Sequence, residues 1–190
     1  MKSTKAKVLH QVAGEPLLGH VLRALHTAGV DDVVVVVGHQ RDKVTEFLHT
    51  AAPNARTAVQ ETMRGTGDAV RQAMPQVPAE TATVMVLAGD TPLLTGATLR
   101  DLVHRHEASG AAATVLTARL DDPTGYGRIV REGDEVRRIV EHKDASAAER
   151  AIDEINSGLY LFEAAALRDD LNHLASHSAP GEEYLTDVIG

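Results

Sequence analysis

Apolar residues near the start of the chain first follow a helical spacing and then form an unbroken run. In GEPLLGHVLRALHTAGV the apolar residues share one helical face, and Pro16 and Gly29 bound the segment. This pattern predicts a helix between those two residues. Five consecutive valines follow, Val33–Val37, with polar residues soon on both sides. Such a run is typical of a strand that is buried on both faces of its sheet.

The alternation of helical and strand patterns continues to about residue 120. We expect helices over about 41–50, 68–74 and 96–110, and strands over about 57–60, 83–87 and 111–120. Strands that alternate with helices predict an α/β fold with a mostly parallel sheet flanked by helices. In such sheets, ligands bind beyond the carboxyl ends of the strands.

The pattern changes after Asp121. GRIVREGDEVRRIVEH has two arms of alternating apolar residues around Glu132–Asp134, which predicts an antiparallel hairpin. A short helix over about 146–150, a strand over 157–162 and a helix from Glu163 complete the pattern. Because no linker, repeat or low-complexity tract divides the chain, we predict one domain with a nucleotide-binding half and a smaller substrate-facing half.

Composition and charge exclude several classes of protein. The 190 residues are 43% hydrophobic and 24% charged, which is ordinary for a globular protein. A formal net charge of −8, with no stripe of Lys and Arg, argues against a nucleic-acid partner. Cysteine is absent, which excludes disulfides and thiolate metal sites. No apolar run approaches the roughly 20 residues that span a bilayer, so we expect a cytoplasmic protein without a membrane partner.

Asp90 is the first candidate for chemistry. It follows an apolar strand in LAGDTPLL, where a proline delays the next helix. One interpretation is that Asp90 closes a turn. The other is that it holds a metal ion at the open end of the sheet. Asp121 and Asp122 form a second acidic pair, but their position before Pro123 favours a turn over paired catalytic carboxylates.

The turn QETMRGTGDA is the second candidate. Gly65 and Gly67 let the backbone approach a ligand closely, and the amide of Gln60 offers a donor and an acceptor that can match a pyrimidine edge. A tight loop before a helix also favours Gly and Thr for structural reasons alone. From the residues alone, both interpretations of this turn stay open.

Several fragments together are more specific than any one motif. In order along the chain they are KVLHQVAGEPLLGHV, RGTGDAV, GDTPLL, LDDPTGYGRIVRE, IVEHKDA, INSGLYLF and GEEYLTDVI. They resemble the N-terminal pyrophosphorylase domain of the GlmU family, the bifunctional bacterial N-acetylglucosamine-1-phosphate uridyltransferases and glucosamine-1-phosphate acetyltransferases. The resemblance implies a Rossmann-like nucleotide-diphospho-sugar transferase fold, with one MobA-like NTP transferase domain over residues 1–190 that is truncated at both ends.

The implied reaction is uridylyl transfer from UTP to N-acetylglucosamine 1-phosphate, which gives UDP-N-acetylglucosamine and pyrophosphate. In the family, the sugar phosphate attacks directly in line, and Mg²⁺ is the cofactor. By motif, Lys7 matches the lysine that contacts the phosphates, and Asp90 matches the magnesium ligand. Gln60 matches a glutamine that reads uracil, and Gly65 with Thr66 matches the loop under the base.

The remaining matched positions belong to the sugar. Gly127, Glu141 and Asn156 match residues that contact the sugar in the family. Tyr184 and Thr186 lie in the segment that closes over the sugar phosphate. Together with the nucleotide positions, these residues form the predicted substrate site.

The sequence also departs from the family pattern. The family begins with a strand and a phosphate loop of the form L-A-A-G-x-G-T-R-M, and this chain starts at the position of the last Met. In the family that strand lies between the strands that correspond to 33–37 and 83–87. A second magnesium ligand, an asparagine, and the acetyltransferase β-helix lie beyond Gly190. We therefore expect impaired turnover, marginal stability or direct pairing of those two strands, and no oligomer without the β-helix.

Two other functions remain open at this stage. Met63, Arg64 and Asp68 differ from the usual family residues, which leaves the nucleotide undetermined. Transfer involving another nucleotide or another sugar phosphate is one alternative. A non-catalytic sugar-nucleotide-binding module that keeps the fold is the other.

Overall fold

The computed structural model describes residues 5–177 and 183–189. The chain divides into two compact units. The first unit comprises Met1–Met63, Ala69–Thr81 and Ala88–Gly110, and the second comprises Arg64–Asp68, Ala82–Leu87 and Ala111–Gly190. The prediction of a single domain over residues 1–190 stays a prediction, although both units draw on interleaved parts of the chain.

The first unit contains elements predicted for the early part of the chain, together with four short elements that were not predicted. The elements are η1 (Lys7–Leu9), β1 (Gln11–Val12), β2 (Glu15–Pro16), α1 (Leu17–Ala28), β3 (Val34–Val37), α2 (Arg41–Ala51), β4 (Arg56–Val59), η2 (Met74–Gln76) and α4 (Gly96–Ser109). Those not predicted are η1, β1, β2 and η2. Helix α3 (Thr66–Ala73) begins in the second unit and continues into the first. Helix α1 ends at Gly29 as predicted, because this residue adopts a φ of 84° that favours glycine.

Strands β3 and β4 form a parallel pair, with Val34 opposite Arg56 and Val37 opposite Val59. Val37 is buried in a cluster with Leu22 and Leu48, but the other valines of β3 are only half-buried. The prediction that the valine strand is buried on both faces is therefore wrong for most of its residues. One reason is that β4 is the only partner of β3 among the described strands, so the other edge of β3 is unpaired.

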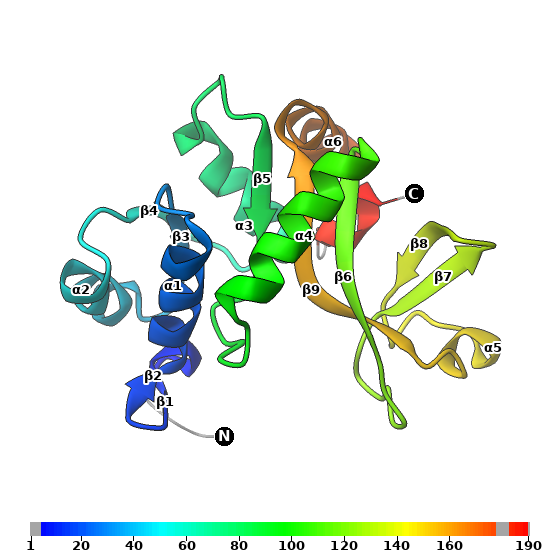
Figure 1. Ribbon diagram of the computed structural model, residues 1–190, viewed down its shortest axis with the longest axis horizontal. Helices are drawn as coiled ribbons and strands as arrows, with labels where there is room; N and C mark the ends of the chain where they lie inside the picture. The colour runs from blue at the N-terminus through cyan, green and yellow to red at the C-terminus, as the bar shows by residue number, and fades with distance from the viewer. Residues whose placement is uncertain (1–4, 178–182, 190) are drawn as a thin grey trace. The chain divides into compact units, whose positions relative to one another are not determined.

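The second unit is built around β9 (Glu154–Glu163). Its other elements are β5 (Thr83–Val86), β6 (Ala113–Arg119), β7 (Arg128–Glu132), β8 (Glu135–Val140), α5 (Ala147–Arg150), α6 (Ala164–His177) and η3 (Leu185–Val188). Strand β9 pairs antiparallel with β5, β6 and β7 (Figure 1). The predicted hairpin is present as β7 and β8.

This pairing corrects one detail of the prediction. Strands β5 and β6 run parallel to each other, as a strand, helix and strand unit should, but β9 lies between them and runs the opposite way. Among the described strands, β3 and β4 are the one parallel pair. The sheet is therefore not mostly parallel, because a strand from late in the chain separates two strands that sequence order alone would place together.

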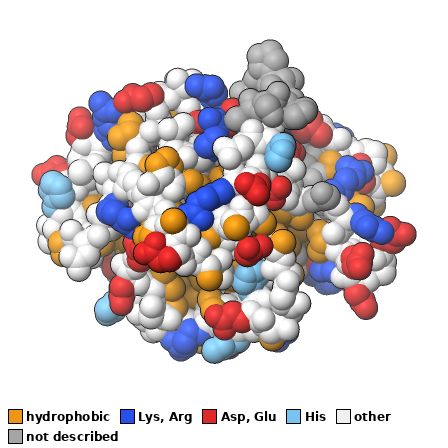
Figure 2. Space-filling view, turned by 90° about the horizontal axis from the view of Figure 1, so that it is seen from above, with side chains coloured by type: hydrophobic (Ala, Val, Ile, Leu, Met, Phe, Trp, Pro, Cys, Tyr) orange, Lys and Arg blue, Asp and Glu red, His pale blue; other side chains and the backbone are white. Residues whose placement is uncertain are grey.

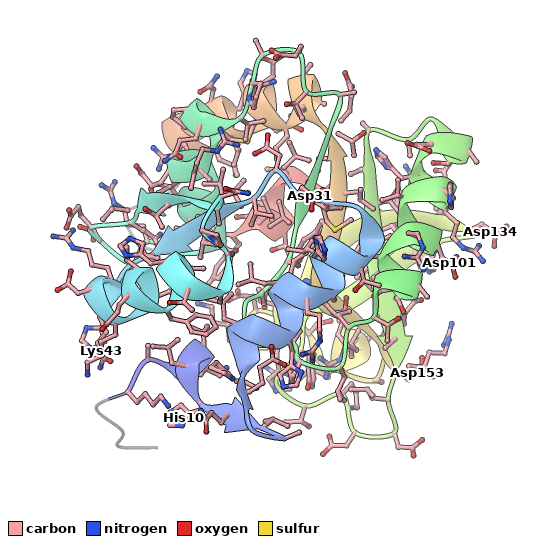
Figure 3. All side chains as sticks on the ribbon, turned by 60° about the vertical axis from the view of Figure 1, so that its left-hand side comes forward. His10, Asp31, Lys43, Asp101, Asp134 and Asp153 are labelled. Atoms are coloured by element: carbon pink, nitrogen blue, oxygen red, sulfur yellow. The ribbon has the colours of Figure 1, made fainter. Side chains whose placement is uncertain are left out.

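An ion pair joins β7 to β9. Arg131 donates through Nε and Nη2 to the two carboxylate oxygens of Glu154, and both distances are 2.8 Å. The side chain of Glu154 is only 8% exposed. The hydrogen bonds from Arg131 lower the pKa of Glu154 to about 2. Arg131 also donates to the Asp134 carbonyl, and Arg119 pairs with Asp153; both aspartates are labelled in Figure 3.

The surface carries charges of both signs. On the face shown in Figure 2, Lys and Arg side chains are interspersed with Asp and Glu rather than gathered into one stripe. Within the described ranges 5–177 and 183–189, the helices are too short or too polar to cross a bilayer.

Candidate functional site

Lys7 and Asp90 form an ion pair in the first unit, between Nζ and Oδ2. Lys7 lies in η1, and Asp90 lies in the turn that follows Gly89. A Cβ atom on Gly89 would lie 3.3 Å from Leu18 Cδ1 and 3.4 Å from Val8 Cγ1. The glycine thus lets this turn pack closely against α1 and η1, which brings the Asp90 carboxylate to the lysine.

The environment of Asp90 fits partial coordination of Mg²⁺. Its side chain is 23% exposed, and its ion-pair partner Lys7 is 81% exposed, so a cation can reach the carboxylate. Among the described residues, no cluster of three or more His, Cys, Asp or Glu could hold a metal ion by itself. Magnesium in nucleotide enzymes is usually held by one or two carboxylates together with substrate phosphates. Asp90 therefore fits as one protein ligand of a metal that phosphates would also bind.

Gln60 lies directly after β4 and is buried. Its backbone N–H donates to the Val37 carbonyl at 2.8 Å, so Gln60 lies at the carboxyl ends of β3 and β4, where ligands of α/β sheets are expected. Met63 lies nearby and is 70% exposed, and its sulfur would be 3.0 Å from a Cβ on Gly38. The predicted base-reading role of Gln60 stays a prediction.

A pocket of about 350 Å³ lies in the second unit. Its walls come from the end of β8 and from the segment that forms η3, and its polar lining residues are Arg138, Glu141, Asp144, Tyr184, Thr186 and Asp187. Three of the five predicted sugar positions are therefore in its lining. The pocket carries three carboxylates, which suits hydrogen bonding to hydroxyl groups better than binding of a phosphate.

Glu141 is the central carboxylate of this pocket. Burial raises its pKa, and the nearby carboxylates of Asp144 and Asp187 raise it further. A hydrogen bond from Thr186 Oγ1 to Glu141 Oε1, at 3.4 Å, and the charge of Lys143 oppose the shift. The Asp187 pKa is also raised, chiefly by burial.

Gly127 and Asn156 lie beside Glu141. A Cβ on Gly127 would be 3.5 Å from Asn156 Cβ and 3.6 Å from Glu141 Oε1, so a side chain there would occupy the space in front of the carboxylate. The Asn156 N–H donates to the Gly127 carbonyl at 2.9 Å. Asn156 Oδ1 accepts from the Gly158 N–H at 2.9 Å, and its amide nitrogen donates to the Tyr160 hydroxyl. These bonds fix the orientation of the Asn156 side chain.

Gly65 and Thr66 contact the segment that carries Tyr184 and Thr186. The Gly67 N–H donates to the Glu183 carbonyl at 2.8 Å, and the Leu185 N–H donates to Thr66 Oγ1 at 3.0 Å. Neither contact was predicted. The structure thus brings Gly65, Thr66, Gly127, Glu141, Asn156, Tyr184 and Thr186 together in the second unit, whereas Lys7, Gln60 and Asp90 belong to the first.

Sequence reasoning missed three residues of the pocket region. Lys143 donates to the Tyr184 hydroxyl and lies 4.9 Å from the centre of its ring. Asp144 and Asp187 line the pocket. The motif IVEHKDA already contains Lys143 and Asp144, but nothing in its spacing shows that they face a segment forty residues later.

The fold is that of the nucleotide-diphospho-sugar transferases. The chain superposes on a Bacillus anthracis protein named as a glucose-1-phosphate thymidylyltransferase, with a TM-score of 0.75 and 20% identity, over 96% of this chain and 72% of that one. Residues 1–180 match the MobA-like NTP transferase domain, and the chain belongs to this family.

Two curated relatives confirm the resemblance found in the sequence. The bifunctional protein GlmU of Thermobifida fusca is 54% identical over 194 residues, and that of Streptomyces coelicolor is 52% identical over 193 residues. In each case the match covers 100% of this chain and 40% of the relative. The chain therefore spans about two fifths of the length of these proteins, and it belongs to the class of nucleotidyltransferases.

Proposed function

We propose that this domain transfers a uridylyl group from UTP to N-acetylglucosamine 1-phosphate. One observation carries the proposal: the five residues predicted to serve the sugar converge in one region of the second unit. Glu141 accepts from Thr186, Gly127 lies against both Glu141 and Asn156, and Tyr184 lines the same pocket as Glu141. The relatives and the family match support the coarser class of reaction, nucleotidyl transfer.

The reaction requires alignment and charge neutralisation rather than a protein nucleophile. A phosphate oxygen of the sugar phosphate forms a bond to the α-phosphorus of UTP. The bond from that phosphorus to the bridging oxygen breaks, and pyrophosphate leaves with the electron pair. The ammonium of Lys7 neutralises phosphate charge. Asp90 would hold Mg²⁺, which would supply further positive charge at the phosphates when bound. Glu141 and Asn156 hold the sugar through its hydroxyl and amide groups.

Thermal unfolding with UDP-N-acetylglucosamine tests the site. A ligand that binds only the folded state stabilises it, by about 2.7 kcal/mol at a concentration of 100 Kd. We expect the melting temperature to rise with millimolar ligand. Glu141→Gln should lose much of this rise because it removes the charge that accepts from sugar hydroxyls. Glu80→Gln, a change of the same kind at an exposed position, should keep it.

Binding and turnover are then compared. No rise in melting temperature with the wild-type chain would contradict the site. A rise without release of pyrophosphate from UTP and N-acetylglucosamine 1-phosphate would instead support a sugar-nucleotide-binding module. A larger rise with a thymidine or guanosine diphosphate sugar would show that another nucleotide is the substrate.

A further inference from the structure

We infer that Thr66 is a positioning residue of the sugar pocket, and that the loop Arg64–Gly67 acts by holding the segment Glu183–Thr186 in place. The inference deepens the proposed function and rests on it. It assigns to Thr66 a task that differs from contact with the base, namely to fix the pocket wall that carries Tyr184 and Thr186.

The loop and the segment are joined first through their backbones. The Glu183 N–H donates to the Arg64 carbonyl at 2.6 Å, and the Glu183 carbonyl accepts from the Gly67 N–H at 2.8 Å. Glu183 is therefore bonded on both sides by the same short loop. All of these residues belong to the second unit.

The glycines of the loop are required by this contact. Gly65 has a φ of 111°, and a Cβ there would lie 2.4 Å from the Glu183 carbonyl oxygen and 3.0 Å from its nitrogen. A Cβ on Gly67 would lie 3.1 Å from the same oxygen. Any side chain at position 65 would push the two backbones apart. The Gly-Thr-Gly pattern is thus explained by close approach to Glu183, independently of any nucleotide.

Thr66 adds a side-chain bond to the next part of the segment. Leu185 begins η3, and its N–H has no partner within the helix because the first turn of a helix leaves its donors free. The preceding residue, Tyr184, makes no side-chain cap. Thr66 Oγ1 accepts from the Leu185 N–H at 3.0 Å. Since Leu185 is buried, water does not easily replace this acceptor.

The bond from Thr66 reaches the sugar pocket in one further step. Thr186 follows Leu185, is buried, and donates to Glu141. Tyr184 precedes Leu185 and lines the pocket, where Lys143 holds its hydroxyl. Loss of the Thr66 acceptor therefore frees the backbone at Leu185, which lies between the two residues that face the sugar, Tyr184 and Thr186. The backbone bonds of Glu183 still hold the start of the segment.

The test compares three substitutions in the full chain. Thr66→Val keeps the shape of the side chain and removes the acceptor, Thr66→Ser keeps the acceptor, and Thr50→Val makes the same change at an exposed position of α2. Titration calorimetry with N-acetylglucosamine 1-phosphate should show roughly 10-fold weaker binding for Thr66→Val, since 1.4 kcal/mol corresponds to a factor of 10. Thr66→Ser and Thr50→Val should stay within about 2-fold of wild type.

The pH dependence of UDP-N-acetylglucosamine binding separates positioning from a general loss of stability. Glu141 is faced by Thr186, Asp144, Asp187, Lys143 and Arg138. If Thr66→Val frees Thr186, Glu141 loses the hydrogen bond that lowers its pKa, and the pH at which binding is half-maximal should rise. A merely destabilised fold lowers the melting temperature without moving that pH. Thr66→Ser should restore the wild-type profile.

Each outcome decides the inference. Wild-type affinity for the sugar phosphate in Thr66→Val would overturn it and leave the proposed function standing. Weaker binding of UTP alone, with unchanged binding of the sugar phosphate, would also overturn the inference. It would instead support a role of Thr66 in contact with the base. If the wild-type chain binds neither the sugar phosphate nor UDP-N-acetylglucosamine, both proposals fail. If Thr66→Val does not fold, Thr66→Ala, which also removes the acceptor of the Leu185 N–H, replaces it with the same expectations.

Discussion

Asp90 was open to two interpretations, and its contacts do not support the turn-closing one. A turn-closing aspartate accepts a hydrogen bond from the backbone a few residues on. Here Thr91 bonds the Ala88 carbonyl across the turn, and the interaction of Asp90 within the described residues is its ion pair with Lys7. Asp122, by contrast, does accept from the Thr124 N–H at 3.1 Å, which confirms its role in a turn.

We predict that Asp90→Asn lowers the rate of pyrophosphate release at least about 100-fold, the effect typical of losing one preorganised electrostatic group. The amide keeps the shape of the side chain but not the charge that attracts Mg²⁺ and Lys7. Asp101→Asn, at an exposed position of α4 labelled in Figure 3, is the matched control and should keep the wild-type rate. Full activity of Asp90→Asn would show that Asp90 has no part in catalysis.

The residues of the candidate site were found by motif, but their contacts were not. The fragments RGTGDAV and GEEYLTDVI marked Gly65 and Tyr184 as site residues without showing that the two fragments touch. Contacts of this kind run from backbone to backbone, as between Glu183 and Gly67. They depend on the path of the chain and leave no periodic signal in the side chains.

Among the elements, β7 and β9 are joined by an ion pair in which Glu154 is buried and Arg131 is 35% exposed. Glu154 accepts two bonds from Arg131, while Glu132 and Arg137 form a pair at the exposed end of the same hairpin, where Glu132 is 72% exposed. An ion pair contributes more when one of its charges is buried than when both are exposed. The two pairs therefore form a matched comparison within one hairpin.

Glu154→Gln should lower the free energy of unfolding at pH 7 by about 3 kcal/mol, because the pKa of Glu154 falls from 4.5 to about 2 on folding. A lowered pKa stabilises the fold above pH 4.5, and this contribution is lost as the pH falls from 4.5 to about 2. Urea unfolding at pH 7 and near pH 2 should show the difference disappear. Glu132→Gln should cost less than about 1 kcal/mol. Equal effects of the two substitutions would contradict a special role for the pair that contains Glu154.

The helices and strands were predicted well from the sequence, but the pairing of strands with one another was predicted less well. Each predicted helix and strand has the type that its apolar spacing indicated, because that spacing is a local property, whereas the short elements η1, β1, β2 and η2 were not predicted. The position of β9 between β5 and β6 was missed. Periodicity tells which face of a strand is apolar, but not which strand lies beside it.

At the scale of the whole molecule, β3 and β5 are among the described strands that have an open edge. Within the described residues, β3 pairs only with β4, and β5 pairs only with β9. Direct pairing of β3 with β5, one of the expected outcomes, is not found in these sheets. Unpaired backbone donors and acceptors must meet water or another strand. Both edges are thus suited to accept a further strand.

We predict that extending the chain before Met1, with a strand and the loop L-A-A-G-x-G-T-R of the family, raises stability and tightens UTP binding together. The added strand supplies partners for the open edges, and the loop supplies N–H donors to phosphates. Chemical unfolding and calorimetry measure the two gains. An extension of the same length made of Gly and Ser is the control and should give neither. A family-like extension that also gives neither would show that the edges do not accept this strand.

The central place of β9 also bears on the order in which the chain acquires its structure during synthesis. All residues of the first unit have been made once residue 110 has emerged from the ribosome, whereas β5 and β6 pair with residues of β9 that are made about 35 to 80 positions later. Contacts between distant parts of a chain form slowly, because closing the long loop between them costs conformational entropy before the contacts can stabilise the chain. The nascent protein therefore carries β5 and β6 without their partner strand until β9 has been made. During this interval the two apolar strands are exposed, and we expect chaperones to bind the chain most strongly then.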